Sequence, residues 1–362
     1  MDFKVISFYK YIELENPESF RNLLREFCLE KDIFGRILIG KEGINGAVSG
    51  SKEAIEAFKS KLIEDQKFSD LTFREQEVQS KTYHKLVVRV RNEIVALGVN
   101  ANMKNKGNHI TPEELKEMLD NEEDLVILDA RNDYEYKVGK FKKAVTLPIE
   151  SFKELPSKIK DIEHLKDKKI VMYCTGGVRC EKSSAFLKEQ GFKDVNQLKG
   201  GIIDYLNKVG PAHYEGSCFV FDNRLGVDMG EPVTECEHCQ KPCGTYINCH
   251  NLDCDKLFVN CDECKKTTKN CSEECKNASR QRPQPEKPKR YVGTITNYFV
   301  KSKIAEAKLV KPLIENTKIS IEGNTTNLEQ EIKELKFHEN EGLVTFPVTE
   351  RVRRNDKLVL VE

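Results

Sequence analysis

The chain has 362 residues and no formal net charge at pH 7; 33% of its residues are charged and 38% are hydrophobic. This length predicts two to four domains, and no apolar run is long enough to cross a membrane. Because the charges balance, any contact with nucleic acid has to come from local basic patches. The segment Met1–Val5 lacks the apolar core of a secretory signal, so we expect a cytoplasmic protein whose thirteen cysteines bind metal or catalyse reactions rather than form disulfides.

Residues 1–97 predict a first domain of mixed α and β structure. Two amphipathic helices are expected, one from Pro17 to Leu29 and one that Ser51 caps. The strand-like runs around them are 3–9, 35–39, 44–49, 71–73 and 85–90. The resulting order of elements, β-α-β-β-α-β, is that of a ferredoxin-like split βαβ fold.

A row of basic residues lies along the last of these strands. Lys85, Arg89 and Arg91 alternate with other residues, so their side chains point to one face of the strand. A solvated sheet face is the ordinary explanation of such a row, and a contact with an RNA backbone is the functional alternative.

A polar stretch at 98–108 predicts a linker, and residues 108–212 predict an α/β domain. Thr111, Pro112 and Glu114 form the start signal of a helix, with a cap, a proline in the first turn and an acidic side chain that reaches back. Buried strands are expected at 125–129, 144–148, 169–173 and 195–198, with a last helix from Gly200. Alternating strands and helices predict a parallel sheet covered on both faces, with its site at the carboxyl ends of the strands.

The most informative stretch of the chain surrounds Cys174. A β-branched run ends at Tyr173, and a helix-favouring segment follows and stops at Gly191, so Cys174 lies between a strand and a helix. The next four residues, Thr175, Gly176, Gly177 and Val178, form a loop whose glycines let backbone N–H groups point inward.

This setting favours a reactive thiolate at Cys174. The helix N-terminus contributes about half a positive charge, and Arg179 can close the loop with its fork of donors. We therefore predict that Cys174 and Arg179 are catalytic, although a buried structural cysteine in a glycine turn is the alternative. Cys180 is either a resolving thiol or a small residue in the first helical turn.

These residues resemble the active loop of the rhodanese superfamily, in which sulfurtransferase members carry a persulfide on the loop cysteine. Asp129, Arg131 and the acidic–aromatic run 133–136 are similar to a second signature of that superfamily. Four residues separate Cys174 from Arg179, whereas the related phosphatases have five and so form a wider cradle for phosphate. The shorter loop favours a sulfur- or oxygen-sized group and disfavours phosphatase activity.

Residues 218–279 predict a zinc-binding segment. Nine cysteines fall within the forty residues from 236 to 275: Cys236, Cys239, Cys243, Cys249, Cys254, Cys261, Cys264, Cys271 and Cys275. Two pairs, Cys236/Cys239 and Cys261/Cys264, have the two-residue spacing that brings both sulfurs to one tetrahedral ion. Structural zinc, with one or two ions and with the pairing left open, is favoured over disulfides.

Residues 280–290 predict a basic, proline-rich linker, and residues 291–362 predict a small β-barrel. Short strands separated by turn residues support the barrel. Tyr291–Thr294 and Arg353–Leu358 resemble the translation-factor type of barrel, which implies an accessory module related to RNA.

The order of a ferredoxin-like domain, a rhodanese domain and a cysteine-rich segment is similar to the tRNA uridine hydroxylase family of rhodanese-type proteins. The runs that carry the resemblance are Ser7–Tyr11, Phe34–Arg36, Glu42–Asn45, Arg131–Tyr136 and Val171–Lys182. The resemblance implies hydroxylation of the wobble uridine of tRNA to 5-hydroxyuridine, with molecular oxygen as co-substrate and Cys174 as the catalytic cysteine. The barrel is extra to the family pattern.

Several features of this chemistry stay open. The chain shows no flavin or haem motif, and the electron donor is unknown. One hypothesis is that Cys174, as thiolate or persulfide, adds to C6 of uracil and makes C5 electron-rich. Two other classes of function are a sulfurtransferase that carries a cysteine persulfide, and a non-catalytic zinc- and RNA-binding scaffold.

Overall fold

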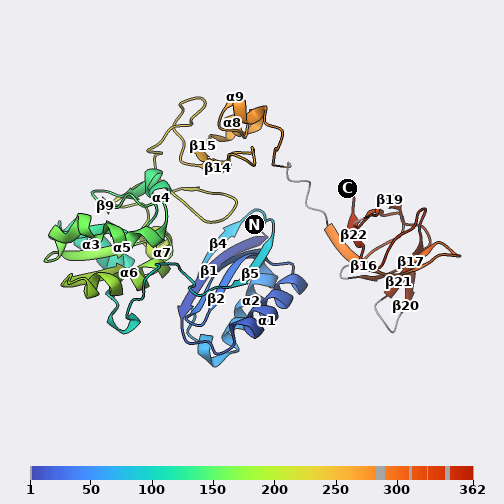
Figure 1. Ribbon diagram of the computed structural model, residues 1–362, viewed down its shortest axis with the longest axis horizontal. Helices are drawn as coiled ribbons and strands as arrows, with labels where there is room; N and C mark the ends of the chain where they lie inside the picture. Colours follow the sequence, from blue (N-terminus) through green and yellow to red (C-terminus); the bar gives the residue numbers. More distant parts are fainter. Residues whose placement is uncertain (1, 283–289, 310–311, 324, 339–342, 362) are drawn as a thin grey trace. The chain divides into compact units, whose positions relative to one another are not determined.

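The computed structural model describes residues 2–282, 290–309, 312–323, 325–338 and 343–361. The chain divides into two compact units, Met1–Gln281 and Arg282–Glu362 (Figure 1). None of the helices in the described ranges has the length and apolarity needed to cross a bilayer. Most of the basic linker predicted at 280–290 lies outside the described residues.

The N-terminal domain, drawn in blue in Figure 1, has a five-stranded sheet in the order β4-β1-β3-β2-β5. Only β2 and β5 run parallel, and the other neighbours are antiparallel. The strands are β1 (Phe3–Tyr11), β2 (Phe34–Gly40), β3 (Gly43–Ser51), β4 (Phe73–Val78) and β5 (Leu86–Val90). The first four follow the predicted ferredoxin-like order, so that prediction is confirmed.

Two helices cover one face of this sheet and leave the other face uncovered by helices of this domain. The helices are α1 (Pro17–Glu30) and α2 (Lys52–Ile63), followed by the 3-10 turn η1 (Gln66–Phe68). Leu24 and Phe58 from these helices pack with Ile6 and Phe8 of β1 in the core. Because side chains alternate along a strand, Val5, Ser7 and the other odd-numbered residues of β1 point away from the helices.

The second domain contains the predicted parallel sheet, in the order β6-β11-β10-β7-β9. The strands are β6 (Asn108–Ile110), β7 (Leu125–Asp129), β9 (Val145–Thr146), β10 (Lys169–Tyr173) and β11 (Asp194–Leu198). The helices are α3 (Pro112–Asp120), α4 (Asp133–Lys137), α5 (Leu155–Lys158), α6 (Val178–Glu189) and α7 (Gly201–Val209), and the 3-10 turns are η2 (Met103–Asn105), η3 (Phe152–Glu154) and η4 (Ile159–Leu165). The predicted capping box at Thr111 and Glu114 is present.

Strand β10 lies at the centre of this sheet and is buried on both faces. Val171 and Tyr173 belong to the core that α3 and α7 cover, whereas Met172 and Cys174 belong to the core that α5 and α6 cover. The predicted doubly covered sheet is therefore confirmed. Cys174 follows the last residue of β10 at the carboxyl end of the sheet.

The cysteine-rich segment has little regular structure. Strand β12 (Tyr214–Cys218) pairs with β8 (Gly139–Phe141) and β13 (Val227–Asp228), and β14 (Tyr246–Asn248) pairs with β15 (Leu257–Val259). Two short helices follow, α8 (Asp262–Thr267) and α9 (Glu273–Lys276).

The C-terminal unit is an antiparallel sheet in the order β19-β18-β22-β16-β17-β21-β20. Its strands are β16 (Arg290–Phe299), β17 (Ile304–Leu309), β18 (Lys318–Glu322), β19 (Asn327–Glu331), β20 (Lys336–His338), β21 (Leu343–Pro347) and β22 (Lys357–Leu360). The predicted strands are present, but among the described residues β19 and β20 do not pair, so the predicted closure into a barrel is not observed. Strand spacing predicts hairpins, whereas closure depends on pairing between the first and last strands, which that spacing does not specify.

Candidate active site

The loop after β10 leads into helix α6, and it is also held by the start of a second helix, α7. The N–H groups of Ile202 and Ile203, in the first turn of α7, donate to the carbonyl oxygens of Cys174 and Thr175 at 3.0 and 3.2 Å. Gly201 has a φ of +67°, and a Cβ there would lie 2.4 Å from the oxygen of Cys174. Only glycine allows this approach, so the glycine pair before α7 is part of the loop's support.

The sulfur of Cys174 is surrounded by hydrogen-bond donors. The N–H of Gly177 donates to it at 3.1 Å, and Gly177, with a φ of +92°, is the N-cap of α6. Burial alone would raise the pKa of this thiol. A hydrogen bond from Cys180, the charge of Arg179 and the N–H groups of residues 179 and 180 outweigh it and lower the pKa to about 5. These donors favour the thiolate form of Cys174 at neutral pH, which is the state that the strand–loop–helix pattern predicts.

Cys180 is the neutral partner of this thiolate. Its side chain is buried and hydrogen-bonded to Cys174, and burial, together with that negative neighbour, raises its pKa well above the usual range. A thiol that keeps its proton next to a thiolate donates a hydrogen bond to it, and the two sulfurs are close enough to form a disulfide if an oxidant removes two electrons. Both interpretations that the sequence left open, a resolving thiol and a small residue in the first helical turn, are compatible with this contact, so the role of Cys180 stays a prediction.

Arg179 closes the loop, but its fork engages a carboxylate that no sequence motif had marked as its partner. Its guanidinium is bidentate to Glu135 and also donates to the Thr175 hydroxyl at 3.2 Å. Thr175 in turn donates to Glu135 at 2.9 Å. The Glu135 side chain has no exposed surface. Burial would raise its pKa, but Arg179 holds that pKa below the usual range.

Glu135 could have been found from its position in the acidic–aromatic run after β7, although nothing in that run indicates that Arg179 is its partner.

A second buried ion pair supports the same region. Arg131 is bidentate to Asp129 and donates to the carbonyl oxygen of Gly139 at 2.7 Å. Tyr173 donates its hydroxyl hydrogen to Asp129. These bonds tie the ends of β7 and β10 together next to the loop.

The N-terminal domain forms hydrogen bonds and ion pairs with the start of α6, directly after the loop. Tyr11 donates to the carbonyl oxygen of Val178 at 3.1 Å, and Tyr9 donates to Glu181 at 3.2 Å. Lys182, which is 5% exposed, forms ion pairs with Glu42 at 2.9 Å and Glu93 at 2.6 Å. Three of the sequence runs that resemble the hydroxylase family, 7–11, 42–45 and 171–182, thus contain all the residues of this contact except Glu93.

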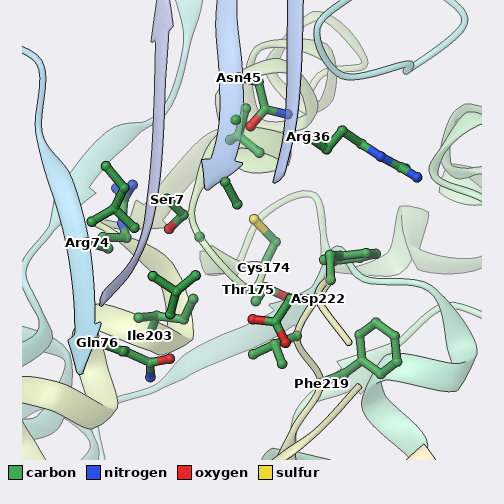
Figure 2. A pocket seen from close by; sticks show the side chains of 18 of the residues that line it. Ser7, Arg36, Asn45, Arg74, Gln76, Cys174, Thr175, Ile203, Phe219 and Asp222 are labelled. Carbon is green, nitrogen blue, oxygen red and sulfur yellow. The ribbon is translucent and has the colours of Figure 1, made fainter. Parts of the chain in front are cut away.

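A cavity of about 440 Å³ lies between the uncovered face of the N-terminal sheet and the Cys174 loop (Figure 2). One wall is formed by side chains of β1 to β4, including Ser7, Arg36 and Asn45, and the other by the loop and the segment after β12. Cys174 belongs to the cavity wall, yet it has no solvent-exposed surface in this structure. A substrate can therefore reach the sulfur only when the wall around it shifts.

The basic row predicted on the first domain borders this cavity but does not line it. Lys85, Arg89 and Arg91 are all exposed. Arg89 neighbours Leu38 of β2 in the β2–β5 register, and Leu38 lines the cavity. The row therefore lies on the same face of the sheet as the cavity, along the edge strand β5. An RNA contact by these residues stays a prediction.

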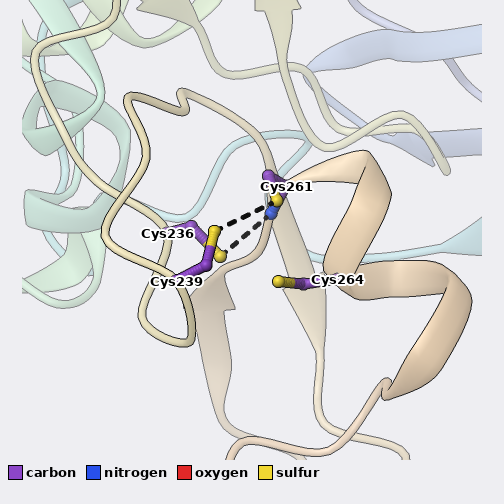
Figure 3. A group of neighbouring side chains, drawn as sticks. All are labelled: Cys236, Cys239, Cys261 and Cys264. Carbon is purple, nitrogen blue, oxygen red and sulfur yellow. Dashed lines mark hydrogen bonds between the residues drawn. The ribbon is translucent and has the colours of Figure 1, made fainter.

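The cysteine-rich segment contains two groups of four thiols. The first consists of Cys236, Cys239, Cys261 and Cys264 (Figure 3), and the second of Cys249, Cys254, Cys271 and Cys275. In each group the sulfurs lie within 4.8 Å of one another, and all the cysteines are free. Successive cysteine pairs alternate between the two groups, so the segment has a cross-braced arrangement. Cys243 belongs to neither group, and neither contains a histidine.

Both groups have the dimensions of a tetrahedral zinc site. Zn–S bonds of about 2.3 Å place the sulfurs of such a site about 3.8 Å apart. The Cys239–Cys261 distance is 3.6 Å, and the Cys254–Cys271 distance is 3.7 Å. The N–H of Cys261 also donates to the sulfur of Cys236 at 3.3 Å, a bond that stabilises a thiolate. Each group can thus hold a metal ion such as zinc.

Comparisons with known proteins agree with this architecture. Residues 3–94 match the family described as UPF0176 acylphosphatase like domain, residues 111–208 match the rhodanese-like domain, and residues 215–276 match the rhodanase C-terminal domain. A tRNA uridine(34) hydroxylase from Cytophaga hutchinsonii is 40% identical over 289 residues, which are 78% of this chain and 92% of that protein. Proteins with the same name from Bacillus pumilus (41% identical over 293 residues; 77% of this chain and 89% of that protein) and Staphylococcus haemolyticus (40% identical over 293 residues; 78% and 91%) are similar to it. The resemblance seen in the sequence is confirmed, and the chain belongs to the tRNA uridine(34) hydroxylase family.

Proposed function

We propose that this protein is an oxygen-incorporating oxidoreductase that converts the wobble uridine of tRNA, uridine 34, into 5-hydroxyuridine in the cytoplasm. The observation that supports it most is a donor-surrounded thiolate at the wall of a nucleoside-sized cavity, in a chain about 40% identical to proteins named for that reaction. Catalysis is assigned to Cys174, with Arg179 and the loop residues Thr175, Gly176, Gly177 and Val178 holding the thiolate.

The chemistry proposed for the chain's own residues begins with addition of the Cys174 thiolate to C6 of uracil. The sulfur supplies the electron pair of the new C–S bond, and the C5–C6 electrons move toward C5 and O4, so that C5 becomes nucleophilic. The N–H groups and the Arg179 charge that hold the free thiolate are available to receive it again when the C–S bond breaks and the product leaves.

Molecular oxygen is the proposed co-substrate. One oxygen atom enters the product, and the other leaves as water, with two electrons and two protons from a reductant outside the chain. Once the C–S bond has broken, Cys174 and Cys180, which lie in contact, can give up two electrons and two protons by forming a disulfide. A dithiol outside the chain would then reduce this disulfide by thiol–disulfide exchange, so we assign the reductant to the dithiol class. In this proposal Cys180 is the resolving thiol.

Zinc is proposed as a structural component, one ion in each group of four thiols. Four sulfur ligands close the coordination sphere and leave no position for substrate, so the ions would brace the segment rather than react. The exposed row of Lys85, Arg89 and Arg91 is proposed to contact the tRNA backbone, since it borders the cavity and its cations can neutralise phosphates.

The decisive experiment compares wild-type protein with Cys174→Ser in a strain that lacks the gene, with mass spectrometry of tRNA nucleosides. Wild type should restore 5-hydroxyuridine and Cys174→Ser should not, because serine cannot supply the thiolate. Binding of tRNA by the purified variant should stay within about twofold of wild type, because one buried sulfur contributes little binding area. Product formed by Cys174→Ser would rule out the proposed role of the thiolate.

A sulfurtransferase is the second candidate, because a loop that stabilises a thiolate with N–H groups also suits a persulfide. This candidate predicts turnover of thiosulfate and cyanide to thiocyanate, a persulfide mass on Cys174, and unchanged tRNA in the gene-deletion strain.

A further inference from the structure

The cavity beside Cys174 contains polar groups whose hydrogen-bonding capacity is not used within the described part of the chain. Several lining groups are already engaged: Asp222 pairs with Arg224, Arg224 donates to Gln76 at 3.1 Å, and Arg74 donates to Gly200 at 3.1 Å. Ser7, Arg36 and the amide oxygen of Asn45 have no such partner among the described residues. These three are among the groups left for a ligand.

The register of the sheet places these free groups together. Ser7 of β1 and Arg36 of β2 both pair with Ala47 of β3, so the three residues form one row across the sheet. Asn45 lies two residues further along β3 and points to the same face. The small side chain of Ala47 leaves a hollow between Ser7 and the stem of Arg36, with the Asn45 amide at its end, and the Arg36 guanidinium extends outward from it (Figure 2). Figure 2 shows Ser7, Arg36 and Asn45 around the cavity that also contains Cys174.

An aromatic side chain lines the same cavity. Phe221 is 54% exposed although it is a large apolar residue, and its ring lies 5.6 Å from the guanidinium carbon of Arg179. An exposed ring at the edge of a polar hollow is a typical platform for an unstacked nucleobase. The volume of about 440 Å³ falls in the range of small-molecule sites and far exceeds the size of thiosulfate.

The orientation of the Asn45 amide selects among bases. Its Nδ2 donates to the carbonyl oxygen of Ile94 at 3.0 Å, so its oxygen is left as a hydrogen-bond acceptor. Uracil has a hydrogen on N3 that this oxygen can accept, whereas cytosine has a lone pair there. N3 and C6 lie at opposite ends of the uracil ring. A uracil held through N3 by Asn45 on the sheet therefore presents C6 to the opposite wall, where Cys174 lies.

We propose that this cavity is the site for a uridine swung out of the tRNA anticodon loop, with N3–H bound by Asn45, the ring stacked on Phe221 and a flanking phosphate bound by Arg36. The assignment deepens the proposed function, on which it rests, by naming the residues that choose uracil. Asn45 acts here as a specificity-determining residue, and Arg36 as a sequence-independent contact.

The test measures binding of two 17-nucleotide anticodon stem-loop RNAs, which differ only by uridine or cytidine at position 34, to full-length protein carrying Cys174→Ser. Fluorescence anisotropy gives the two dissociation constants. The parent should prefer uridine by about tenfold, the value expected when one hydrogen bond is replaced by an unsatisfied pair of acceptors. Adding Asn45→Ala should bring the preference to within about twofold. Asn22→Ala, on the exposed side of α1, is the matched control and should keep it.

Two further variants separate stacking and charge from base choice. Phe221→Ala should weaken the binding of both RNAs by about 5- to 100-fold, the range for loss of one base–aromatic stack. Because the Phe221 side chain is largely exposed, its removal is not expected to unfold the protein. Arg36→Ala should weaken both RNAs equally, by about tenfold, whereas the matched Arg25→Ala on α1 should not. Circular dichroism checks that each variant is folded.

The proposal is overturned if the parent binds both RNAs equally, or if Asn45→Ala keeps the full preference for uridine. Its failure can be told apart from failure of the proposed function. If wild-type protein forms 5-hydroxyuridine but Asn45→Ala discriminates normally, the cavity assignment is wrong and the function stands. If wild type forms no 5-hydroxyuridine but the preference depends on Asn45, the function is wrong and the uracil site stands.

Discussion

The proposed chemistry depends on one residue, Cys174, and on the ionised form of its sulfur. Its environment combines opposing effects: burial disfavours the thiolate, and donors from α6, Cys180 and Arg179 favour it more strongly. Arg179 is itself bidentate to buried Glu135, so its position relative to the sulfur is fixed. A buried thiol would ordinarily be inert, and the donors reverse that expectation.

The first prediction at this scale concerns the protonation of Cys174. The difference in absorbance at 240 nm between wild type and Cys174→Ser should titrate near pH 5, because the other buried thiols cancel in the difference. Product formation should stay level from pH 8 to pH 6 and fall as the pH drops through about 5, where the thiolate gains a proton. A titration near pH 9 would contradict the assignment.

A second prediction concerns the donor thiol. Cys180→Ala removes a hydrogen bond to the thiolate, so the pKa of Cys174 should rise relative to wild type. Cys180→Ser keeps a donor at the same position and should raise the pKa less. If both variants leave the titration unchanged, Cys180 is only a packing residue.

At the scale of elements, helix α6 connects the two domains of the first unit to the reactive loop. Its first turn donates to Cys174, and its next residues, Glu181 and Lys182, are held by Tyr9, Glu42 and Glu93 of the N-terminal domain and the segment after it. The sheet face without helices and the loop are thereby kept together around the cavity. The N-terminal domain is thus part of the site and not only a neighbour.

Lys182→Met tests this contact. It removes a nearly buried ammonium from two carboxylates, and we expect a loss of about 2 kcal/mol in the free energy of unfolding, below the range for a fully buried pair because the carboxylates are partly exposed. Denaturant unfolding measures this loss, and hydrogen exchange should speed up in the first turn of α6. Lys193→Met removes an exposed ion pair in the same domain and should change neither.

At the scale of the whole molecule, the cross-braced cysteine segment is a part of the first unit that has little apolar core. Each group of thiols joins two chain segments that are distant in sequence; in the first group more than twenty residues separate Cys239 from Cys261. Metal bonds can replace a core in such a segment, because ion binding then contributes directly to folding. The C-terminal unit has its own core, which includes Ile295, Ile321 and Phe346.

Metal content tests the two-site arrangement. Purified protein should contain two zinc ions per chain by plasma emission spectroscopy. Cys254→Ser should retain one, because it removes a ligand from the second group only. Cys243→Ser is the matched control and should retain two, since Cys243 lies in neither group. Loss of zinc from the control, or full retention by Cys254→Ser, would contradict the pairing.

The sequence by itself determined the local features of this protein. Hydrophobic period and glycine placement predicted β10, the loop and α6, and the spacing of Cys236/Cys239 and Cys261/Cys264 predicted thiol pairs for a metal. These features are local because they depend on residues within a few positions of one another. The exact ends of strands were not predicted, and neither were the strands β6, β8, β12 to β15, β19 and β20. Each of these strands has too few residues, or too few apolar ones, to show a period.

Only the tertiary structure decided which distant groups meet. The pairing of Arg179 with Glu135, the sharing of one site by Cys236/Cys239 and Cys261/Cys264, and the hollow formed by Ser7, Ala47 and Arg36 all join residues without a fixed spacing. In the described part of the C-terminal unit, the strands β19 and β20 do not pair although a barrel was predicted, and this difference has the same origin. Such contacts depend on which sheet faces and loop ends pack together, and that packing is set by the burial of whole domains rather than by any local pattern.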